Sequence, residues 1–509
     1  MAFSCYIWNI SFIKQLASLI RIIDSNIKIL YGGPEVSFES EEFLKNNPGE
    51  FLIEGEGEET FKEFVEAVIY GKELSSIAGL FVKHEFEIFY GGKRELMDIN
   101  KLIFPYDDEE NFENKIIYYE GARGCPFNCK YCLSSTIRGV RFIELERLKK
   151  DISFLVDKKI RLVKFVDRTF NCNNKFALEV WKYLSLLDTD TAFHFEISAD
   201  ILTEEQLEFL KTVPKGRFQF EIGVQTTNKE ILKNINRFVS FEAVKNQVLK
   251  LKNYGNIKQH LDLIAGLPGE NFASFKNSFN DLYELEPDEI QLGFLKLIKG
   301  SPMKAEASEW GIAASPYEPY EVIKTDDISY EELLLLKKAE EMVDKYYNSG
   351  KFTSILKYFT PKFTTAFDFY LNLGLFFQRK GYFNRSLSSV DYYKVFIEFC
   401  EEELKEESKI LKELVKYEYL KYNRKKWLPD FLYRNNNKQL DRKIREMFKN
   451  NGSPLKDTNY HVEEFMMDIN GFLEDSRITE GYYYYVFHED NVENIEDITY
   501  IIINEKILV

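Results

Sequence analysis

The chain has 509 residues, which is more than one ordinary hydrophobic core holds, so we expect two or three domains. With 45% hydrophobic and 29% charged residues the composition is that of a globular protein, and the sequence contains neither a signal peptide nor an 18-residue apolar run. The formal net charge of −16 argues against a general nucleic-acid binder, and six cysteines, three of them clustered, do not form a disulfide framework.

Residues 1–75 alternate short apolar segments with amphipathic ones. Strands are expected in AFSCYIW, IKILYGG and EFLIEGEG, and helices in SFIKQLASLIRII, SFESEEFLK and EETFKEFVEAVIY. This order is typical of a flavodoxin-like α/β domain, but the sequence opens directly on a strand, so we expect only half of such a domain. Residues 76–114 follow as a hairpin, predicted at 78–91, and a polar linker.

Three cysteines stand close together in the segment GARGCPFNCKYCLSS. Cys125, Cys129 and Cys132 have the spacing C-x3-C-x2-C. Three thiolates can hold three irons of a 4Fe-4S cubane and leave the fourth iron without a protein ligand, open to a substrate or cofactor. Tyr131, directly before the last cysteine, presents an aromatic face on which an adenine could stack. Such a cluster requires reduced thiols, so we expect a cytoplasmic protein.

Other metal sites fit this spacing less well. A structural zinc ion takes four ligands, and the next candidates, Cys172 and His194, lie far along the chain. A ferredoxin-type cluster usually has a fourth cysteine at short spacing. We therefore expect Cys172 to be an incidental thiol and His194 to pack or hydrogen-bond within a strand.

Residues 115–310 contain six apolar strand candidates separated by amphipathic helical patterns such as 144–158 and 175–187. The strands are expected at 116–122, 161–167, 192–198, 217–225, 260–268 and 289–297. This alternation predicts β/α units with a parallel sheet, and six units instead of eight predict an open, partial (β/α)6 barrel of the TIM type.

Polar residues stand where the strands of this predicted barrel end. They are Asp167, Glu196, Glu221, Gln225 and Asp262. In barrels of this kind the chemistry lies at the C-terminal ends of the strands, and the cysteine loop also follows the first strand. The pattern predicts a polar rim around a ligand next to the cluster.

Residues 311–509 differ from the barrel because they are mainly helical. Apolar residues at three- and four-residue spacing predict helices at 329–347, 385–402 and 403–424, and two strands are expected at 481–490 and 498–509. The many aromatic residues of this C-terminal domain are more consistent with a hydrophobic core than with a substrate pocket.

The cysteine loop and the barrel pattern resemble the radical SAM superfamily. The resemblance implies that the amino and carboxylate groups of S-adenosylmethionine chelate the open iron, and that reductive cleavage gives methionine and a 5′-deoxyadenosyl radical. The cofactors supply this chemistry and the protein positions them. The resemblance also implies an electron donor of the flavodoxin or ferredoxin type.

The same resemblance implies roles for individual residues. Asp167, in DRTF, lies where the family contacts the methionine amino group, and Glu196 and Ser198 face the methionyl end. Arg237, in KNINRF, matches a basic residue that pairs with the methionine carboxylate, for which the fork of a guanidinium is suited. The positions that match the ribose and adenine contacts are Gln225, Asp262 and Gly266.

The N-terminal segment resembles the second half of a cobalamin-binding domain fused to radical SAM enzymes, and the C-terminal domain resembles one of unknown function from the same group. The resemblance places Ser4, Gly32 and Gly33 near the nucleotide tail of cobalamin. The family's first two strands and its Asp-x-His-x-x-Gly loop are absent from the sequence. A sheet that lacks them has a bare apolar edge. We therefore expect either that the sequence begins at an internal start or that the rest of the protein, or a second copy, covers this edge.

The sequence therefore predicts a radical SAM enzyme with a 4Fe-4S cluster and S-adenosylmethionine as cofactors. It would modify a small-molecule or peptide substrate, by methyl transfer where cobalamin binds. The predicted domains are residues 1–75, the hairpin and linker 76–114, the barrel 115–310 and the helical domain 311–509. The alternative is a non-catalytic iron–sulfur or metal-binding scaffold whose front half is an interaction surface. No membrane and no nucleic acid is expected as a partner.

Overall fold

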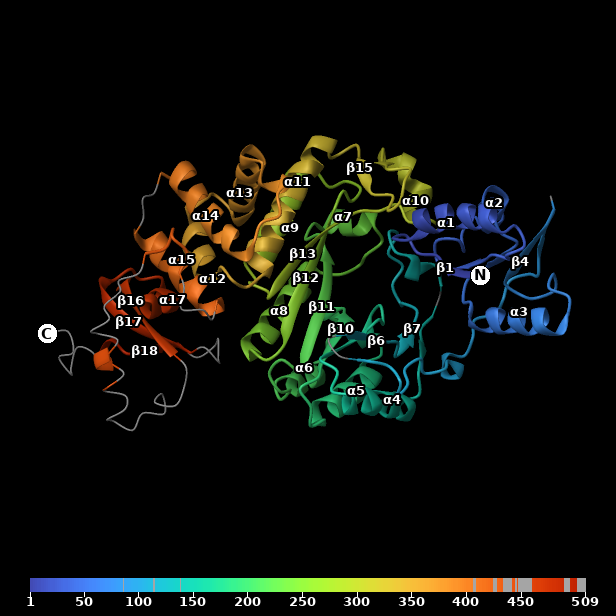
Figure 1. The fold of residues 1–509 in the computed structure, drawn as a ribbon, viewed down its shortest axis with the longest axis horizontal. Coiled ribbons are helices and arrows are strands. Elements are labelled where there is room, and N and C mark those ends of the chain that lie inside the picture. Colours follow the sequence, from blue (N-terminus) through green and yellow to red (C-terminus); the bar gives the residue numbers. More distant parts are fainter. Residues whose placement is uncertain are drawn as a thin grey trace. The chain divides into compact units, whose positions relative to one another are not determined.

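The structure, a computed structural model, describes residues 1–500 except 86, 113–114, 138, 406–408, 424–427, 434–441, 445, 447–459 and 489–494. The chain divides into two compact units (Figure 1). The first comprises residues 1–287 and 291–333, and the second residues 288–290 and 334–509. No helix in the described ranges is long and apolar enough to cross a membrane.

The first unit begins with a five-stranded sheet in the order β1-β2-β3-β4-β5. The first three strands are parallel and the last two antiparallel, so the predicted hairpin is confirmed and extends the N-terminal sheet. Strand β1 forms one edge of the sheet. The elements are β1 (Ala2–Ser4), α1 (Ile10–Ile23), β2 (Leu30–Gly32), α2 (Ser40–Asn46), β3 (Phe51–Ile53), α3 (Glu58–Tyr70), β4 (Leu80–His84) and β5 (Glu87–Tyr90).

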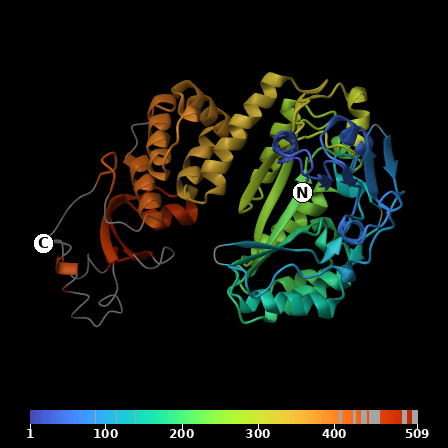
Figure 2. The same cartoon turned by 45° about the vertical axis from the view of Figure 1, so that its right-hand side comes forward.

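A six-stranded sheet in the order β13-β12-β11-β10-β9-β6 forms the centre of the first unit, and Figure 2 shows its curvature. Neighbouring strands from β6 to β12 are parallel, and β6 and β13 are the two edges, which confirms the open, partial barrel. The strands are β6 (Ile116–Tyr119), β9 (Leu162–Phe165), β10 (Ala192–Ile197), β11 (Phe218–Gln225), β12 (Lys258–Ala265) and β13 (Glu289–Phe294). The intervening helices are α4 (Leu145–Asp157), α5 (Asn174–Leu186), α6 (Glu204–Leu210), α7 (Lys229–Asn234), α8 (Phe241–Tyr254) and α9 (Phe272–Tyr283).

The central strands have one apolar and one polar face because side chains alternate along a strand. In β11 the residues Phe218, Phe220, Ile222 and Val224 are buried, whereas Gln219, Glu221, Gly223 and Gln225 between them are only half-buried. The register puts Glu196 of β10 and His260 of β12 beside Glu221, and Asp262 beside Gly223. The polar positions of three strands therefore share one face of the sheet.

Short elements complete the first unit. Strands β7 (Ala122–Arg123) and β8 (Arg141–Phe142) pair antiparallel and bracket the cysteine segment. After β13 come α10 (Pro302–Glu306) and the antiparallel pair β14 (Ala313–Ala314) and β15 (Val322–Lys324).

The second unit is mainly helical, as predicted. Its helices are most of α11 (Tyr330–Met342), which begins in the first unit and continues as one π-helical segment (Val343–Asn348), α12 (Thr353–Phe359), α13 (Ala366–Lys380), α14 (Ser389–Glu403), α15 (Lys409–Tyr422) and α17 (Ile469–Asp475). Its antiparallel sheet consists of β16 (Tyr460–Met467), β17 (Glu480–His488) and β18 (Ile495–Asp497). The strand predicted at 481–490 is therefore found as β17, whereas most of the one predicted at 498–509 lies outside the described residues.

Candidate functional site

The cysteine segment is a loop whose two ends are held together by β7 and β8. At these ends Gly124 has a φ of +109°, and a Cβ atom there would lie 2.2 Å from the carbonyl oxygen of Gly139. Only glycine permits both this backbone conformation and this close approach. The three cysteines are thus carried by a loop that is closed at its base.

A cavity of about 230 Å³ lies between this loop and the ends of the barrel strands. It is lined by the three cysteines together with polar residues that lie on β10, β11 and β12 or follow β9 and β10. Of the residues predicted for the site, the cavity brings together Cys125, Cys129, Tyr131, Cys132, Glu196, Ser198, Gln225, Arg237 and Asp262.

The three thiols share this cavity and interact with one another. Burial raises the pKa of the Cys125 thiol, and the nearby Cys132 and Cys129 raise it further. Cys125 Sγ lies 3.5 Å from Thr169 Oγ1, and Arg237 Nη1 donates to Cys129 Sγ at 3.7 Å. Among the residues the structure describes, no three His, Cys, Asp or Glu side chains are arranged to hold one metal ion. Ligands of a cubane bind separate irons, so this donor set of three thiols fits a cluster.

Several buried polar atoms at the cavity have no hydrogen-bond partner within the described part of the chain. They are Oδ1 of Asp262, Oε1 of Gln225 and Nε of Arg237. Buried polar groups are normally satisfied, so these atoms indicate a polar ligand. Both acceptor and donor atoms are available, which fits the hydroxyl, amino and carboxylate groups of S-adenosylmethionine. Gln225 also has a φ of +72° next to a register shift between β11 and β12, an unusual conformation for a side chain of its kind.

The carboxylate of Glu221 lines the same cavity, although the resemblance implies no individual role for this residue. His194 Nε2 and Lys164 Nζ each lie 3.2 Å from Glu221 Oε2. The hydrogen bond from His194, together with the charge of Lys164, lowers the pKa of Glu221 to about 2. The predicted hydrogen bonding of His194 within the sheet is thus found. The alternation of side chains along the strands is the sequence signal that could have placed Lys164, His194 and Glu221 on the same face of the sheet.

Two predicted residues are not brought to the cavity. Asp167 is buried and does not line the cavity, and its Oδ2 accepts a hydrogen bond from the backbone N–H of Gly121 at 2.9 Å. The next residues, Arg168 and Thr169, line the cavity instead. Gly266, with a φ of +83°, faces the side chain of Val322 rather than the cavity.

A second cavity of about 700 Å³ lies at the carboxyl end of the N-terminal sheet. Ser4, Gly32 and Gly33 line it, so the three residues predicted for cobalamin are brought together. Gly33 has a φ of +112° and lets the chain pass Cys5, since a Cβ there would lie 2.6 Å from its carbonyl oxygen. The opposite wall comes from the cysteine loop and includes Leu133, Thr136 and Ile137.

The sequence models of three protein families match the chain. The B12 binding domain matches residues 1–65, the radical SAM superfamily residues 119–282, and a protein of unknown function (DUF4080) residues 308–497. The chain therefore contains a radical SAM domain between a B12-binding domain and a C-terminal DUF4080 domain, which confirms the resemblance seen in the sequence. The radical SAM match implies a 4Fe-4S cluster and S-adenosylmethionine.

The curated relatives include proteins that are methyltransferases by name. An uncharacterized methyltransferase of Pyrococcus horikoshii is 25% identical over 287 residues, which cover 54% of this chain and 62% of that protein. The cobalamin-dependent radical SAM methyltransferase TokK of Streptomyces tokunonensis is 23% identical over 360 residues, which cover 63% of this chain and 50% of TokK. The chain thus spans about half to three fifths of the length of these relatives.

Solved structures show the same fold. The methyltransferase TsrM of Kitasatospora setae, with tryptophan substrate and a SAM analog bound, aligns with a TM-score of 0.52 at 16% identity and covers 62% of this chain and 66% of TsrM. The enzyme OxsB with aqua-cobalamin bound aligns with a TM-score of 0.53 at 15% identity and covers 82% of this chain and 70% of OxsB.

Proposed function

We propose that this protein is a radical SAM enzyme that binds a 4Fe-4S cluster through Cys125, Cys129 and Cys132 and S-adenosylmethionine in the adjoining cavity. The observation that carries the proposal is that the three thiols line the same cavity as the unsatisfied polar atoms of Gln225, Arg237 and Asp262. When bound, the cluster supplies one electron to the sulfonium, whose cleavage gives methionine and a 5′-deoxyadenosyl radical.

The lining residues would hold S-adenosylmethionine along its length. Arg237 pairs with the methionine carboxylate, because its Nε is buried without a partner among the described residues and a guanidinium binds carboxylates with two bonds. Asp262 and Gln225 accept hydrogen bonds from the ribose hydroxyls, and Tyr131 stacks on the adenine. Glu196 and Ser198 lie at the methionyl end.

Asp167 and Gly266 act indirectly in this proposal. Asp167 holds the backbone at Gly121, just before the cysteine loop, and leaves the methionyl contact to Arg168 and Thr169. Gly266 keeps the turn after β12 in its left-handed conformation.

We further propose that cobalamin binds in the 700 Å³ cavity beside Ser4, Gly32 and Gly33, and that the enzyme transfers a methyl group to a small-molecule or peptide substrate. The B12-binding match over residues 1–65 and the names of the relatives support this. The reductant would be a flavodoxin or ferredoxin, and the reduced thiols favour the cytoplasm. We also propose domain limits near residues 75, 114 and 310, with the hairpin β4–β5 of the segment 76–114 attached to the N-terminal sheet by the pairing of β3 with β4.

The test is anaerobic reconstitution of the full chain with iron and sulfide, followed by dithionite and S-adenosylmethionine. We expect iron bound to the wild type, a shift of its electron paramagnetic resonance signal on addition of S-adenosylmethionine, and formation of 5′-deoxyadenosine. Cys129→Ala should lose the cluster, whereas Cys172→Ala, a free thiol outside the cavity, should retain it. Cobalt uptake from hydroxocobalamin is measured alongside, because methyl transfer can proceed without release of 5′-deoxyadenosine.

The competing function is a non-catalytic iron–sulfur scaffold. It predicts a bound cluster whose resonance signal is unchanged by S-adenosylmethionine. That result, with no 5′-deoxyadenosine and no methylation, would replace the enzymatic proposal.

A further inference from the structure

The loop that carries the cysteines closes through a very short hairpin. Strands β7 and β8 have two residues each, and Arg123 is the direct cross-strand partner of Arg141. A two-stranded ribbon of this length is marginal by itself. Like charges placed directly opposite each other on neighbouring strands weaken it further. Something outside the hairpin must therefore hold these ends together.

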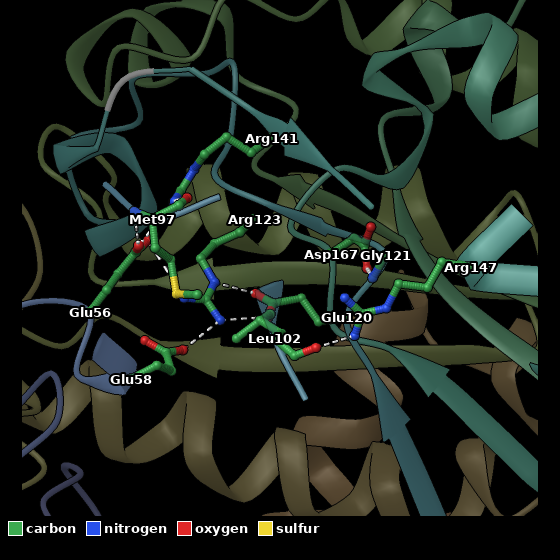
Figure 3. A network of polar contacts seen from close by, with 10 residues as sticks. All are labelled: Glu56, Glu58, Met97, Leu102, Glu120, Gly121, Arg123, Arg141, Arg147 and Asp167. Carbon is green, nitrogen blue, oxygen red and sulfur yellow. Dashed lines mark hydrogen bonds and ion pairs between the residues drawn. The ribbon is translucent and has the colours of Figure 1, made fainter. Parts of the chain in front are cut away.

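The counter-charge comes from the N-terminal domain. Glu56, in the loop between β3 and α3, accepts two hydrogen bonds from Arg141, from Nη1 at 2.9 Å and from Nη2, and its Oε1 lies 3.6 Å from Nη1 of Arg123 (Figure 3). The backbone N–H of Met97 also donates to Glu56 at 3.2 Å. Only 12% of the Glu56 side chain is exposed, so solvent screens these contacts little.

The two arginines depend on Glu56 to different degrees. Arg123 also forms two hydrogen bonds with Glu120, at 2.8 and 2.7 Å, and an ion pair with Glu58 at 2.9 Å. Within the described residues, Arg141 is paired with no other carboxylate than Glu56. Removing one partner of a poorly exposed pair leaves the other charge uncompensated, which costs more than the pair contributes.

The loop that presents Glu56 is also a wall of the second cavity. Gly55, Glu56 and Gly57 line the 700 Å³ cavity, together with Arg123 and residues of the cysteine loop. The carboxylate of Glu56 therefore lines the 700 Å³ cavity and also supports the cysteine loop, which lines the 230 Å³ cavity.

We propose that Glu56 is a positioning residue through which the N-terminal domain holds the cysteine loop closed, by bridging Arg123 and Arg141. This inference rests on the proposed function for its purpose, because a loop with three cluster ligands must keep them at fixed separations. In this proposal the B12-binding domain helps to organise the cluster site in addition to binding its own ligand.

The experiment is hydrogen–deuterium exchange of the full chain without cluster, followed by mass spectrometry of peptides that span residues 122–142. In Glu56→Gln, which keeps the shape but removes the charge, we expect these amides to exchange about tenfold faster, as for loss of a charge-assisted hydrogen bond. The matched control is Glu63→Gln, because Glu63 makes a similar two-bond pair with Arg94 away from the loop. It should leave the exchange of residues 122–142 unchanged.

A second variant distinguishes repulsion between the arginines from a general loss of structure. Glu56→Gln combined with Arg141→Gln removes the like-charge pair, and we expect exchange to return to within about threefold of the wild type. Exchange at the wild-type rate in Glu56→Gln would overturn the proposal, and so would a double variant that exchanges as fast as the single one.

Iron retention gives the second readout. After reconstitution, Glu56→Gln should lose iron to a chelator faster than Glu63→Gln and the wild type. If the wild type binds no iron, the proposed function fails, whereas the exchange experiment still decides whether Glu56 holds the loop.

Discussion

Three carboxyl groups on neighbouring strands of the barrel sheet differ strongly in their affinity for protons. Burial raises the pKa of Glu196, and it raises the pKa of Asp262 well above its usual range, with a further contribution from Glu221. Glu221 itself has a pKa near 2 because His194 and Lys164 stabilise its charge. On this wall of the cavity the negative charge is therefore most favourable on Glu221 and less favourable on Glu196 and Asp262.

Glu270 is a buried carboxyl group outside the cavity whose ionisation should affect stability. Burial raises its pKa to about 8, although a hydrogen bond from Thr226 at 2.7 Å opposes the shift. A group with a higher pKa in the folded state stabilises the fold fully below its unfolded pKa and loses that contribution as the pH rises. For Glu270 this interval runs from 4.5 to about 8.

Over this interval we expect the contribution of Glu270 to the free energy of unfolding to fall by up to about 1.4 kcal/mol per pH unit. Urea unfolding of the wild type and of Glu270→Gln at several pH values measures it. The free energy of unfolding of Glu270→Gln should lack this part of the pH dependence, whereas a variant with a substitution at the exposed Glu242 should keep it. Parallel curves for the wild type and Glu270→Gln would contradict the prediction.

At the level of elements, the closed base of the cysteine loop depends on Gly124. In Gly124→Ala the added methyl group would meet a backbone oxygen 2.2 Å away in addition to the strain of a positive φ, so β7 and β8 cannot pair. We expect this variant to lose most of its iron after reconstitution. Gly139→Ala is the matched control, because Gly139 also has a positive φ, of +88°, but no atom within 4 Å of the added carbon. Equal iron contents in the two variants would show that the close approach is unimportant.

Helix α14 of the second unit begins with a capping box. The side chain of Ser388 accepts from the N–H of Asp391, and the Asp391 carboxylate accepts from the N–H of Ser388. Ser388→Ala should lower the stability of this unit by about 1 kcal/mol. Substitution of the adjacent, exposed Ser389 should change it little, as measured by denaturant unfolding followed by circular dichroism.

For the molecule as a whole, the division into two compact units predicts two unfolding transitions in calorimetry. Ser388→Ala should lower the temperature of one transition and leave the other unchanged, because Ser388 lies in the second unit only. Bound iron should shift the temperature of the other transition, because the three cysteines lie in the first unit. A single transition that moves with both changes would show that the two units unfold together.

Most of the fold could be predicted from the sequence. All six barrel strands and the helices between them follow from apolar periodicity, since each is four or more residues long. Strands β7 and β8 could not be found this way, because two residues carry no period. The attachment of the hairpin β4–β5 to the N-terminal sheet was also missed, since pairing between distant segments leaves no local signal.

The candidate site could be predicted in part. The cysteines and the strand-end residues carry local motifs, and the cavity brings most of them together. The contact of the buried Asp167 with Gly121 and the bridge from Glu56 to Arg141 join residues 46 and 85 positions apart in the chain, which spacing alone does not reveal.

In the eight residues of β11, buried side chains that contribute to folding alternate with side chains on the face of the cavity. Phe218, Phe220, Ile222 and Val224 contribute buried apolar area, so polar replacements there should reduce the amount of intact protein in the cell. Glu221 and Gln225, on the other face, touch the cavity, so replacements there should spare protein abundance and reduce turnover. Saturation mutagenesis along this strand should give one profile for protein abundance and one for turnover per intact protein. Both should repeat every two residues, and the positions that are sensitive in one profile should be tolerant in the other.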